Sequence, residues 1–294
     1  MIVGPSLHWG SVMRAMAPQL ISVAVLSVAA VWLVDRNGQT WISLPGLPLT
    51  VITASLGIFL GFRNNSAYDR WWEARTLWGG MVNEGRTLVR RAGNLGDEAL
   101  AQSAARHVAG FAQAARRQLR DENPTAELNR IFGDEEGIRF ARRRSPAIAV
   151  LEEFAQACRV AFNEGRIGEN RLVALEDSLS RLTDCYGGCE RIKNTPMIRL
   201  YDDIPQAMVY IVMALLPFAL VKELHWFTPP SALLVAFLFL SLDMIGRTVE
   251  SPFASTINDV PITAIATNIE ADAFAMTGAG PVPEPIRPVD GYLL

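Results

Sequence analysis

The chain has 294 residues, of which 50% are hydrophobic and 19% charged, and its mean hydropathy is +0.19. A positive mean hydropathy argues against an ordinary soluble protein, and a net charge of -3 excludes a protein that binds nucleic acid by general electrostatic attraction. Three cysteines and three histidines, scattered along the chain, argue against a disulfide scaffold and a histidine-rich metal site.

Charged residues are concentrated in the middle of the chain. Residues 63–203 contain 22 of the 27 basic and 21 of the 30 acidic residues, which leaves both ends apolar. We therefore predict an all-α membrane protein in four parts. These are a membrane hairpin in residues 1–62, a helical cytosolic region in 63–203, a second hairpin in 204–242, and a cytosolic C-terminal segment in 243–294.

Four apolar stretches are candidates for membrane-spanning helices. Residues 17–34, 37–62 and 204–221 contain no charged residue, and residues 224–242 contain only His225 as a titratable group. Their lengths of 18, 26, 18 and 19 residues are close to the roughly 20 that cross a bilayer as a helix. Buried core helices are the alternative, because the first and third stretches are short. The arrangement in two pairs around a charged block favours four spans.

Residues that flank these stretches indicate their orientation. The aromatic residues beside the two predicted turns, as in an interfacial belt, are Trp32, Trp41, Trp226 and Phe227. The arginines that border the opposite ends are Arg14, Arg63, Arg70, Arg75, Arg199 and Arg247. By the positive-inside rule, both termini and residues 63–203 are cytoplasmic. Because residues 17–34 exceed the apolar core of a signal peptide, we expect this span to be retained.

Apolar residues of the cytosolic region recur at helical spacing. One such face consists of Ile148, Leu151, Phe154, Cys158 and Phe162, and a second of Leu172, Leu175, Leu179, Leu182 and Tyr186. Strand-like alternation is absent. Residues 121–124 and 133–137 are predicted turns or loops, and the Gly/Pro-rich residues 277–290 are predicted to lack regular structure.

Motifs of catalysis are missing from the sequence. The chain has no nucleophile elbow, P-loop or dinucleotide fingerprint, so we expect no enzyme, no catalytic residue and no cofactor. Cys185 and Cys189 enclose Tyr-Gly-Gly, which differs from the two-residue gap of thiol redox motifs and lacks a second ligand pair. We expect no metal site there, and assign the glycines to close packing or a helix break.

The second predicted span passes into charged sequence without a proline stop, so a single helix is expected to continue from the membrane into the cytosol. Ala54, Ile58 and Phe62 share one face of this helix, and Gly57 and Gly61 form a second line suited to close helix contact. Packed around a symmetry axis, the apolar stripe would line a dry constriction that gates by dewetting. Facing outward, it would contact lipid. Periodicity leaves both interpretations open.

Three separated motifs point to a known family. The first, LGFRNNSAYDRWWEAR at residues 60–75, contains Arg70, Trp71 and Trp72. The second is YGGCERI at residues 186–192 with Thr195-Pro196, and the third is Glu250-Ser-Pro252-Phe253 followed by Asn258-Asp259. Together they resemble the bestrophin family, in its bacterial branch, and the resemblance covers about residues 5–275.

The resemblance implies a homopentameric ion channel in the inner membrane, with four spans per subunit around a central pore. Its partners would be the lipid bilayer, copies of itself and monovalent ions. The second span would line the pore, with an apolar neck at Ala54, Ile58 and Phe62. Ala54 is smaller than the residue usual in the family, which leaves Ile58 and Phe62 as the constriction. A second, cytosolic aperture is implied near Leu172.

Animal members of the family bind calcium through an acidic run after their Pro-Phe motif. Residues 254–259 stand at that place here and contain one carboxylate, Asp259, whereas Ca²⁺ takes about six to eight oxygen ligands. We therefore expect no calcium site of the animal type. Asn258 and Asp259 are interpreted as helix-capping residues.

The sign of the permeant ion depends on charges near the neck, because an apolar ring has no charge preference. Asp69 and Glu73 continue the face of Phe62 at helical spacing, and fivefold repetition would make each an acidic ring that favours cations. Pairing with arginines of the same helix is the alternative. The resemblance implies anion conduction for animal members of the family and cation conduction for bacterial ones. Because the motifs here are of the bacterial type and the acidic calcium-binding run is missing, we expect monovalent cations such as sodium, with an anion channel of the same architecture as the alternative.

Two other classes of protein remain open. A secondary transporter would have broken helices that carry polar groups at the bilayer midplane. Pro217, Pro229 and Pro230 could break spans, but no charge lies in the middle of one. A membrane-anchored scaffold would instead use its cytosolic helices to bind a partner.

Overall fold

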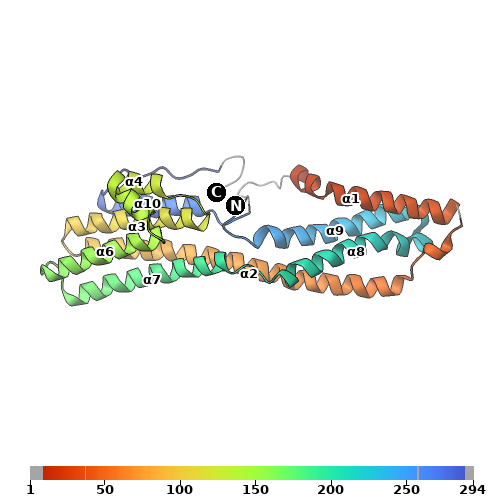
Figure 1. Cartoon of the computed structure of the whole chain (residues 1–294), viewed down its shortest axis with the longest axis horizontal. Coiled ribbons are helices and arrows are strands. Elements are labelled where there is room, and N and C mark those ends of the chain that lie inside the picture. The colour runs from red at the N-terminus through yellow and green to blue at the C-terminus, as the bar shows by residue number, and fades with distance from the viewer. Residues whose placement is uncertain (1–8, 37, 257, 289–294) are drawn as a thin grey trace. The chain divides into compact units, whose positions relative to one another are not determined.

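The computed structural model describes residues 9–36, 38–256 and 258–288, and these residues form helices and connecting turns without a strand (Figure 1). The predicted all-α class is confirmed.

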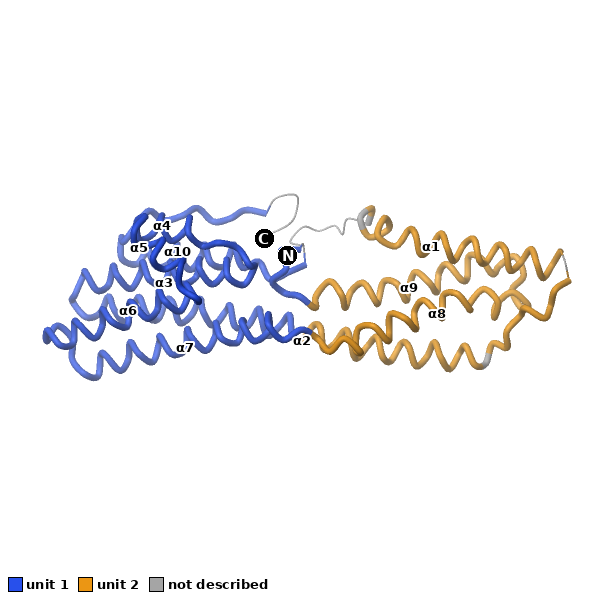
Figure 2. The backbone as a smooth tube through the Cα atoms, viewed as in Figure 1, with its two compact units in different colours: residues 1–4, 70–196, 251–294 blue, residues 5–69, 197–250 orange. Residues whose placement is uncertain are grey.

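The chain divides into two compact units (Figure 2). Among the described residues, unit 1 contains 70–196, 251–256 and 258–288, and unit 2 contains 9–36, 38–69 and 197–250. Helix α2, Gly46–Gly93, contributes to both. Its 48 residues continue without a break, as the absence of a proline stop predicts.

Unit 2 is a helical bundle with an apolar core. It contains α1 (Trp9–Val31), the first part of α2, α8 (Arg199–Leu224) and α9 (Thr228–Val249) (Figure 2). All four helices contribute side chains to this core, which explains why each is apolar in sequence. The core residues are Met16, Val23, Leu49, Leu56, Leu60, Val209, Val212, Met213, Leu216, Ala219, Ala232, Ala236 and Leu240.

Short turns join these helices in pairs. The π-helical turn η1 (Trp32–Arg36) and the 3₁₀ turn η2 (Thr40–Ile42) follow α1, and the 3₁₀ turn η3 (His225–Phe227) joins α8 to α9. The two connections meet, because Nδ1 of His225 lies 2.8 Å from Oδ1 of Asp35. The aromatic residues Trp32, Trp41, Trp226 and Phe227 are exposed here by 52%, 82%, 62% and 74%.

Two described stretches are long and apolar enough to cross a membrane, Val12–Arg36 and Arg199–Val249. The second has 51 residues and contains both α8 and α9. This criterion concerns length and composition alone, so the count of four spans stays a prediction.

Unit 1 packs the second part of α2 and several further helices around a second core. These helices are α3 (Glu98–Leu119), α4 (Thr125–Phe132), α5 (Asp134–Ala141), α6 (Pro146–Asn163), α7 (Glu169–Asn194) and α10 (Ile262–Thr277). Large side chains fill the centre of this core, including the completely or almost completely buried Trp78, Phe111, Phe154 and Tyr186.

The two apolar faces predicted for this region contribute to its core, with differences at their ends. The buried residues are Leu175, Leu179, Leu182 and Tyr186 on α7, and Leu151, Phe154 and Cys158 on α6. At the ends of α6 the buried positions are Ala147 and Ala161. Phe162 follows Ala161, so it is turned about 100° away from the buried side and is 38% exposed, whereas Ile148 is partly buried and packs against the core.

One predicted loop is wrong in part. Residues 121–124 connect α3 to α4 as expected, but residues 134–137 belong to α5. The break between α4 and α5 is Gly133, whose φ of +92° lies in a region that glycine adopts readily. A single residue is therefore enough to separate the helices, and the acidic first turn of α5 favours its helical start.

The Tyr-Gly-Gly segment between Cys185 and Cys189 lies inside α7, so its glycines do not break the helix. A Cβ atom on Gly188 would lie 2.8 Å from Cδ1 of Leu77, and one on Gly80 would lie 2.8 Å from Sγ of Cys185. Close packing of α2 against α7 is therefore the role of Gly188 and of Gly80, whereas Gly187 has open space around it.

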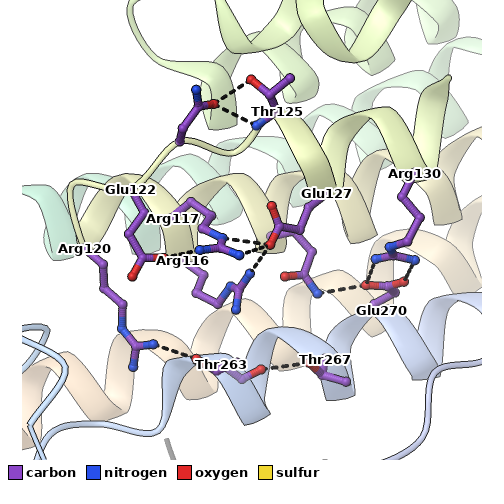
Figure 3. A network of polar contacts seen from close by, with 12 residues as sticks. Arg116, Arg117, Arg120, Glu122, Thr125, Glu127, Arg130, Thr263, Thr267 and Glu270 are labelled. Carbon is purple, nitrogen blue, oxygen red and sulfur yellow. Dashed lines mark hydrogen bonds and ion pairs between the residues drawn. The ribbon is translucent and has the colours of Figure 1, made fainter. Parts of the chain in front are cut away.

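Polar side chains attach α10 to α3 and α4 (Figure 3). Glu270 is 1% exposed and accepts hydrogen bonds from Nη1 and Nη2 of Arg130 at 2.6 and 2.8 Å and from Nε2 of Gln113 at 2.8 Å. Arg120 donates to Oγ1 of Thr263 at 2.6 Å. After α10, residues 278–288 lack regular structure, as predicted, whereas Thr277 is still part of the helix, and residues 289 and 290 lie outside the described residues.

Candidate functional site

One side of α2 in unit 2 is exposed and apolar. Ile58 and Phe62 are each 61% exposed, and Ala54 is exposed as well. Leu56 and Leu60 are completely buried on the opposite side. The predicted stripe therefore lies on the surface of the single chain, where lipid, water or another copy must cover it.

The small residues beside this stripe have open surface around them. A Cβ atom built on Gly57 or Gly61 would meet no atom of the described residues within 4 Å. Small residues of this kind allow the backbone of another helix to approach closely. No helix of the described chain occupies this surface, so it is open to lipid, water or a helix of another copy.

The buried side of α2 carries a charge directly after Phe62. Arg63 is 1% exposed, and its Nη1 lies 2.6 Å from Oδ1 of Asp243 on α9, while its Nη2 lies 2.6 Å from Oδ1 of Asp202 on α8. Arg247 of α9 lies 3.3 Å from Asp202 and 3.1 Å from Asp243. The two arginines and two aspartates, called the Arg63 cluster below, cancel in formal charge, which a buried ion requires.

A close contact between α2 and α9 accompanies the cluster. Nδ2 of Asn64 donates to the carbonyl of Leu242 at 2.9 Å. A Cβ atom on Gly246 would lie 2.2 Å from Oδ1 of Asn64. Glycine at this position therefore lets α9 approach the polar side chains of α2.

Sequence reasoning did not find the Arg63 cluster. It assigned Arg63 and Arg247 to the cytoplasmic border and ended the last apolar stretch at Leu242, whereas α9 continues to Val249. Asp243 and Arg247 are four residues apart, a spacing that puts them on one face of a helix. No local spacing, however, brings Asp202 and Arg63 to that face, because those contacts join distant parts of the chain.

The two acidic residues that follow the stripe differ in their surroundings. Asp69 is exposed, and no ion pair of Asp69 occurs among the described residues. Glu73 forms an ion pair with Arg191 of α7. The sequence leaves pairing of Glu73 with arginines of its own helix as the alternative, and the structure adds a partner on another helix. Arg70 of α2 donates to the backbone carbonyls of Ile192 and Thr195.

The other motif residues make contacts within unit 1. The indole N–H of Trp71 donates to the carbonyl of Asn258 at 3.0 Å, while Trp72 is 55% exposed. Phe253 is 5% exposed and belongs to the core of unit 1. The buried Pro252 accepts a hydrogen bond at its carbonyl from the amide of Val260 at 3.1 Å. The hydrogen bond from Trp71 therefore attaches the segment around Asn258 to α2, and the one between Val260 and Pro252 lies within that segment.

Asp259 stabilises a turn and does not cap a helix, which corrects the expectation from the sequence. Its buried carboxylate accepts hydrogen bonds from the amide of Thr256, at 2.8 Å, and from the hydroxyl of the same residue. Helix α10 begins later, at Ile262. Within the described part of the chain, no group of three or more His, Cys, Asp or Glu residues is placed to hold a metal ion.

Leu172, the residue implied for a cytosolic aperture, is half-buried at the first part of α7 and packs against the core of unit 1. The neighbouring Val173 is 62% exposed. Because the described chain is a single copy, an aperture formed by several copies near Leu172 stays a prediction.

These features define an all-helical protein with an apolar bundle of helices and a stripe of exposed apolar residues along its longest helix. The sequence model of the family described as "Bacterial/Fungal Bestrophin protein" matches residues 6–274. The chain belongs to this family. It is therefore a membrane protein and an ion channel, and the family and its relatives indicate a channel and not an enzyme.

Known relatives and structures agree with this assignment. The chain is 32% identical to the "Voltage-dependent anion channel-forming protein YneE" of Escherichia coli K12 in an alignment of 303 positions that covers 100% of both proteins. A protein of the same designation from Ralstonia nicotianae is 32% identical over 92% of each chain. The crystal structure of a bacterial bestrophin homolog from Klebsiella pneumoniae, 31% identical, superposes with a TM-score of 0.86 over 90% of this chain and 100% of that one.

Proposed function

We propose that the chain assembles as a homopentamer in which five copies of α2 surround an ion pathway, with an apolar neck formed by Ile58 and Phe62. The observation that carries this proposal is the exposure of both side chains on one face of α2, opposite the buried Leu56 and Leu60. Ala54 continues the stripe, but its small side chain leaves a wider ring.

The neck acts as a barrier because an ion must lose water to pass a ring of apolar side chains. Ile58 and Phe62 are four residues apart, so their rings are separated by about 6 Å along the helix. Two such rings in succession form a dry segment, and conduction requires that the neck widen or become wet.

Contact with lipid is the competing explanation for the exposed stripe. Two features favour the pore. Gly57 and Gly61 beside the stripe offer open surface to a neighbouring helix. The same face also continues from Phe62 to the exposed, polar Asn65 and the exposed Asp69, which is a sequence of groups suited to an aqueous path.

For the permeant ion we propose monovalent anions such as chloride, in place of the cations that the sequence favoured. The relatives from Escherichia coli and Ralstonia nicotianae are named anion channel-forming proteins. In addition, the ion pair with Arg191 compensates the charge of Glu73, which weakens one of the two acidic rings that supported cations.

One observation keeps cations as a second candidate. Asp69 is exposed on the face of Phe62, and five copies would form an acidic ring that attracts cations. The reversal potential of single channels in a tenfold KCl gradient distinguishes the two ions, since ideal selectivity for either gives about 59 mV with opposite sign. Asp69→Asn should shift a cation-selective reversal potential toward zero and leave an anion-selective one on the same side.

We also propose that the protein lies in the inner membrane with four spans, and that both termini and residues 63–203 face the cytoplasm. Arginines border the spans on that side, while Arg36 and Lys222 on the other side each adjoin an acidic residue. A cysteine introduced at Lys222 should react with a membrane-impermeant thiol reagent added outside, and one introduced at Arg199 should not.

The geometry of the helices argues against the transporter alternative. Helix α8 continues through Pro217, and Pro229 and Pro230 lie at the beginning of α9, so these prolines interrupt neither helix near its middle. The Arg63 cluster lies in the first turn of α8 and the last turns of α9, away from a midplane site. Recordings from single channels exclude both a transporter and a scaffold if unitary currents occur.

Alanine substitutions test the neck directly. Ile58→Ala and Phe62→Ala should each raise the unitary conductance or the open probability in planar bilayers, because smaller side chains widen the ring. Ile211→Ala on α8 is the matched control, since Ile211 is also exposed, by 53%. Unchanged currents in both neck variants would place the barrier elsewhere. The detergent-purified protein should have the mass of five subunits, and a monomer or dimer would refute the assembly.

A further inference from the structure

We propose that Arg63 is a positioning residue for the neck, because its carboxylate partners on α8 and α9 fix the rotation of α2 that turns Phe62 away from the core. This inference rests on the proposed neck. Arg63 follows Phe62 directly, and one residue step turns a side chain by about 100° around a helix. Accordingly, Phe62 is 61% exposed while Arg63 is 1% exposed.

The partners of Arg63 come from two different helices. Its Nη1 contacts Asp243 of α9 and its Nη2 contacts Asp202 of α8, each at 2.6 Å. Nη1 donates a hydrogen bond to Asp243, whereas Nη2 and Asp202 form an ion pair outside hydrogen-bond geometry. A planar guanidinium group directs its donors along fixed lines. Asp243 therefore holds the group by a directed hydrogen bond and Asp202 holds it by charge, and through the Arg63 side chain the two helices fix the orientation of α2 at this level.

The charges of the Arg63 cluster compensate one another only in this arrangement of the three helices. Arg247 pairs with both aspartates and its side chain is 34% exposed, whereas Arg63 has almost no access to water. If α2 turned or moved outward, Arg63 would lose both partners within an apolar bundle. An unpaired buried charge is strongly unfavourable, so the cluster resists such a movement.

The neck can then widen in two ways. Helix α2 moves together with α8 and α9, or the Arg63 cluster opens. In both cases Asp202 and Asp243, which lie away from the exposed face, influence the position of Phe62. The hydrogen bond from Asn64 to Leu242 supports the same contact but joins neutral groups, so the charged cluster carries most of the constraint.

A double-mutant cycle in the full-length channel tests this role, with the open probability of single channels as the readout. Arg63→Gln should raise the open probability by about fivefold, a size typical of coupled residues. In the Phe62→Ala background the ring that Arg63 positions is missing. Arg63→Gln should therefore change the open probability there by less than about twofold. Arg63→Lys keeps the charge without the planar group and should have an intermediate effect.

Asp203→Asn is the matched control, because Asp203 adjoins Asp202, is exposed, and forms no ion pair among the described residues. Asp203→Asn should leave the open probability unchanged both in the wild type and in the Phe62→Ala background. If Phe62→Ala changes the currents but Arg63→Gln has no effect, or the same effect in both backgrounds, the positioning role is refuted and the neck stands. If Phe62→Ala itself has no effect, the neck is wrong and the positioning role falls with it.

Loss of Arg63 also removes a buried charge, and the variant channel must assemble for the cycle to be read. If Arg63→Gln does not assemble, Asp202→Asn takes its place, because it keeps the pair between Arg63 and Asp243. Asp202→Asn should raise the open probability by about twofold in the wild-type background and leave it unchanged in the Phe62→Ala background. Equal effects in the two backgrounds would refute the inference here as well.

Discussion

Replacement of Arg130 should weaken the attachment of α10 to α3 and α4 far more than neutralisation of its ion-pair partner Glu270. The Glu270 side chain is 1% exposed, whereas that of Arg130 is 47% exposed. Removal of Arg130 leaves a buried carboxylate with Gln113 as its remaining hydrogen-bond partner among the described residues. Removal of the Glu270 charge leaves a guanidinium group that water reaches easily. Replacement of Arg130 therefore costs more free energy than neutralisation of Glu270, although both break the same ion pair.

The contacts give the size of this difference. An uncompensated buried charge costs about 3–5 kcal/mol, and the hydrogen bond of 2.8 Å from Gln113 places Arg130→Met at the lower end. About 3 kcal/mol corresponds to roughly 100-fold in the equilibrium for local opening of α10. Glu270→Gln loses charge-assisted hydrogen bonds worth about 1.5 kcal/mol, which is roughly tenfold.

Hydrogen–deuterium exchange of the full-length protein in detergent measures both values. Amides of α10, Ile262–Thr277, should lose about 100-fold protection in Arg130→Met and about tenfold in Glu270→Gln. Arg139→Met is the control, because Arg139 and Glu153 are both well exposed, at 52% and 37%, and such pairs contribute little. Equal loss of protection in the two variants, or no loss in Arg130→Met, would refute the reasoning from burial.

Three further predictions concern stability and metal dependence. Burial lowers the pKa of His107 below its usual 6.5, so the unfolded state takes up a proton at a higher pH than the folded state does. Thermal stability should therefore be full above about pH 7 and fall toward about pH 5. His107→Gln should make this fall smaller. Gly137→Ala should lower the free energy of unfolding by about 1–3 kcal/mol, because its Cβ would lie 2.5 Å from the backbone nitrogen of Asn129. Gly187→Ala places its Cβ in open space and should stabilise α7 by about 0.5–1 kcal/mol. Equal effects of the two substitutions in thermal unfolding would contradict this. Since Asp259 already binds Thr256, single-channel currents should be the same with EGTA and with calcium, and a reversible loss in EGTA would contradict that assignment.

Local patterns in the sequence predict much of the fold. The spacing of Leu175, Leu179, Leu182 and Tyr186 identifies the buried face of α7, and the absence of a proline stop predicts that α2 continues from its apolar part into its charged part. These features depend on helical periodicity, which a single sequence contains. The stripe of Ile58 and Phe62 is predicted in the same way, and the structure adds that this face is exposed in the single chain.

Long-range contacts could not be predicted in this way. Arg63 reads as an ordinary cytoplasmic flanking residue, and its burial depends on Asp202 and Asp243, which are far away in the chain. Glu73 likewise pairs with Arg191 on another helix, although arginines of α2 are closer in sequence. The start of α5 was missed for a different reason, because Gly133 makes the whole turn alone.

The central claim, that ions pass the ring formed by Phe62, is tested most directly by charging that ring. The reversal potential of single channels is measured for Phe62→Lys and Phe62→Glu in the same KCl gradient as the wild type. If Phe62 lines the pathway, five lysines should shift the potential toward that of chloride and five glutamates toward that of potassium, whichever ion the wild type prefers. Conducting variants that both retain the wild-type reversal potential would contradict the account.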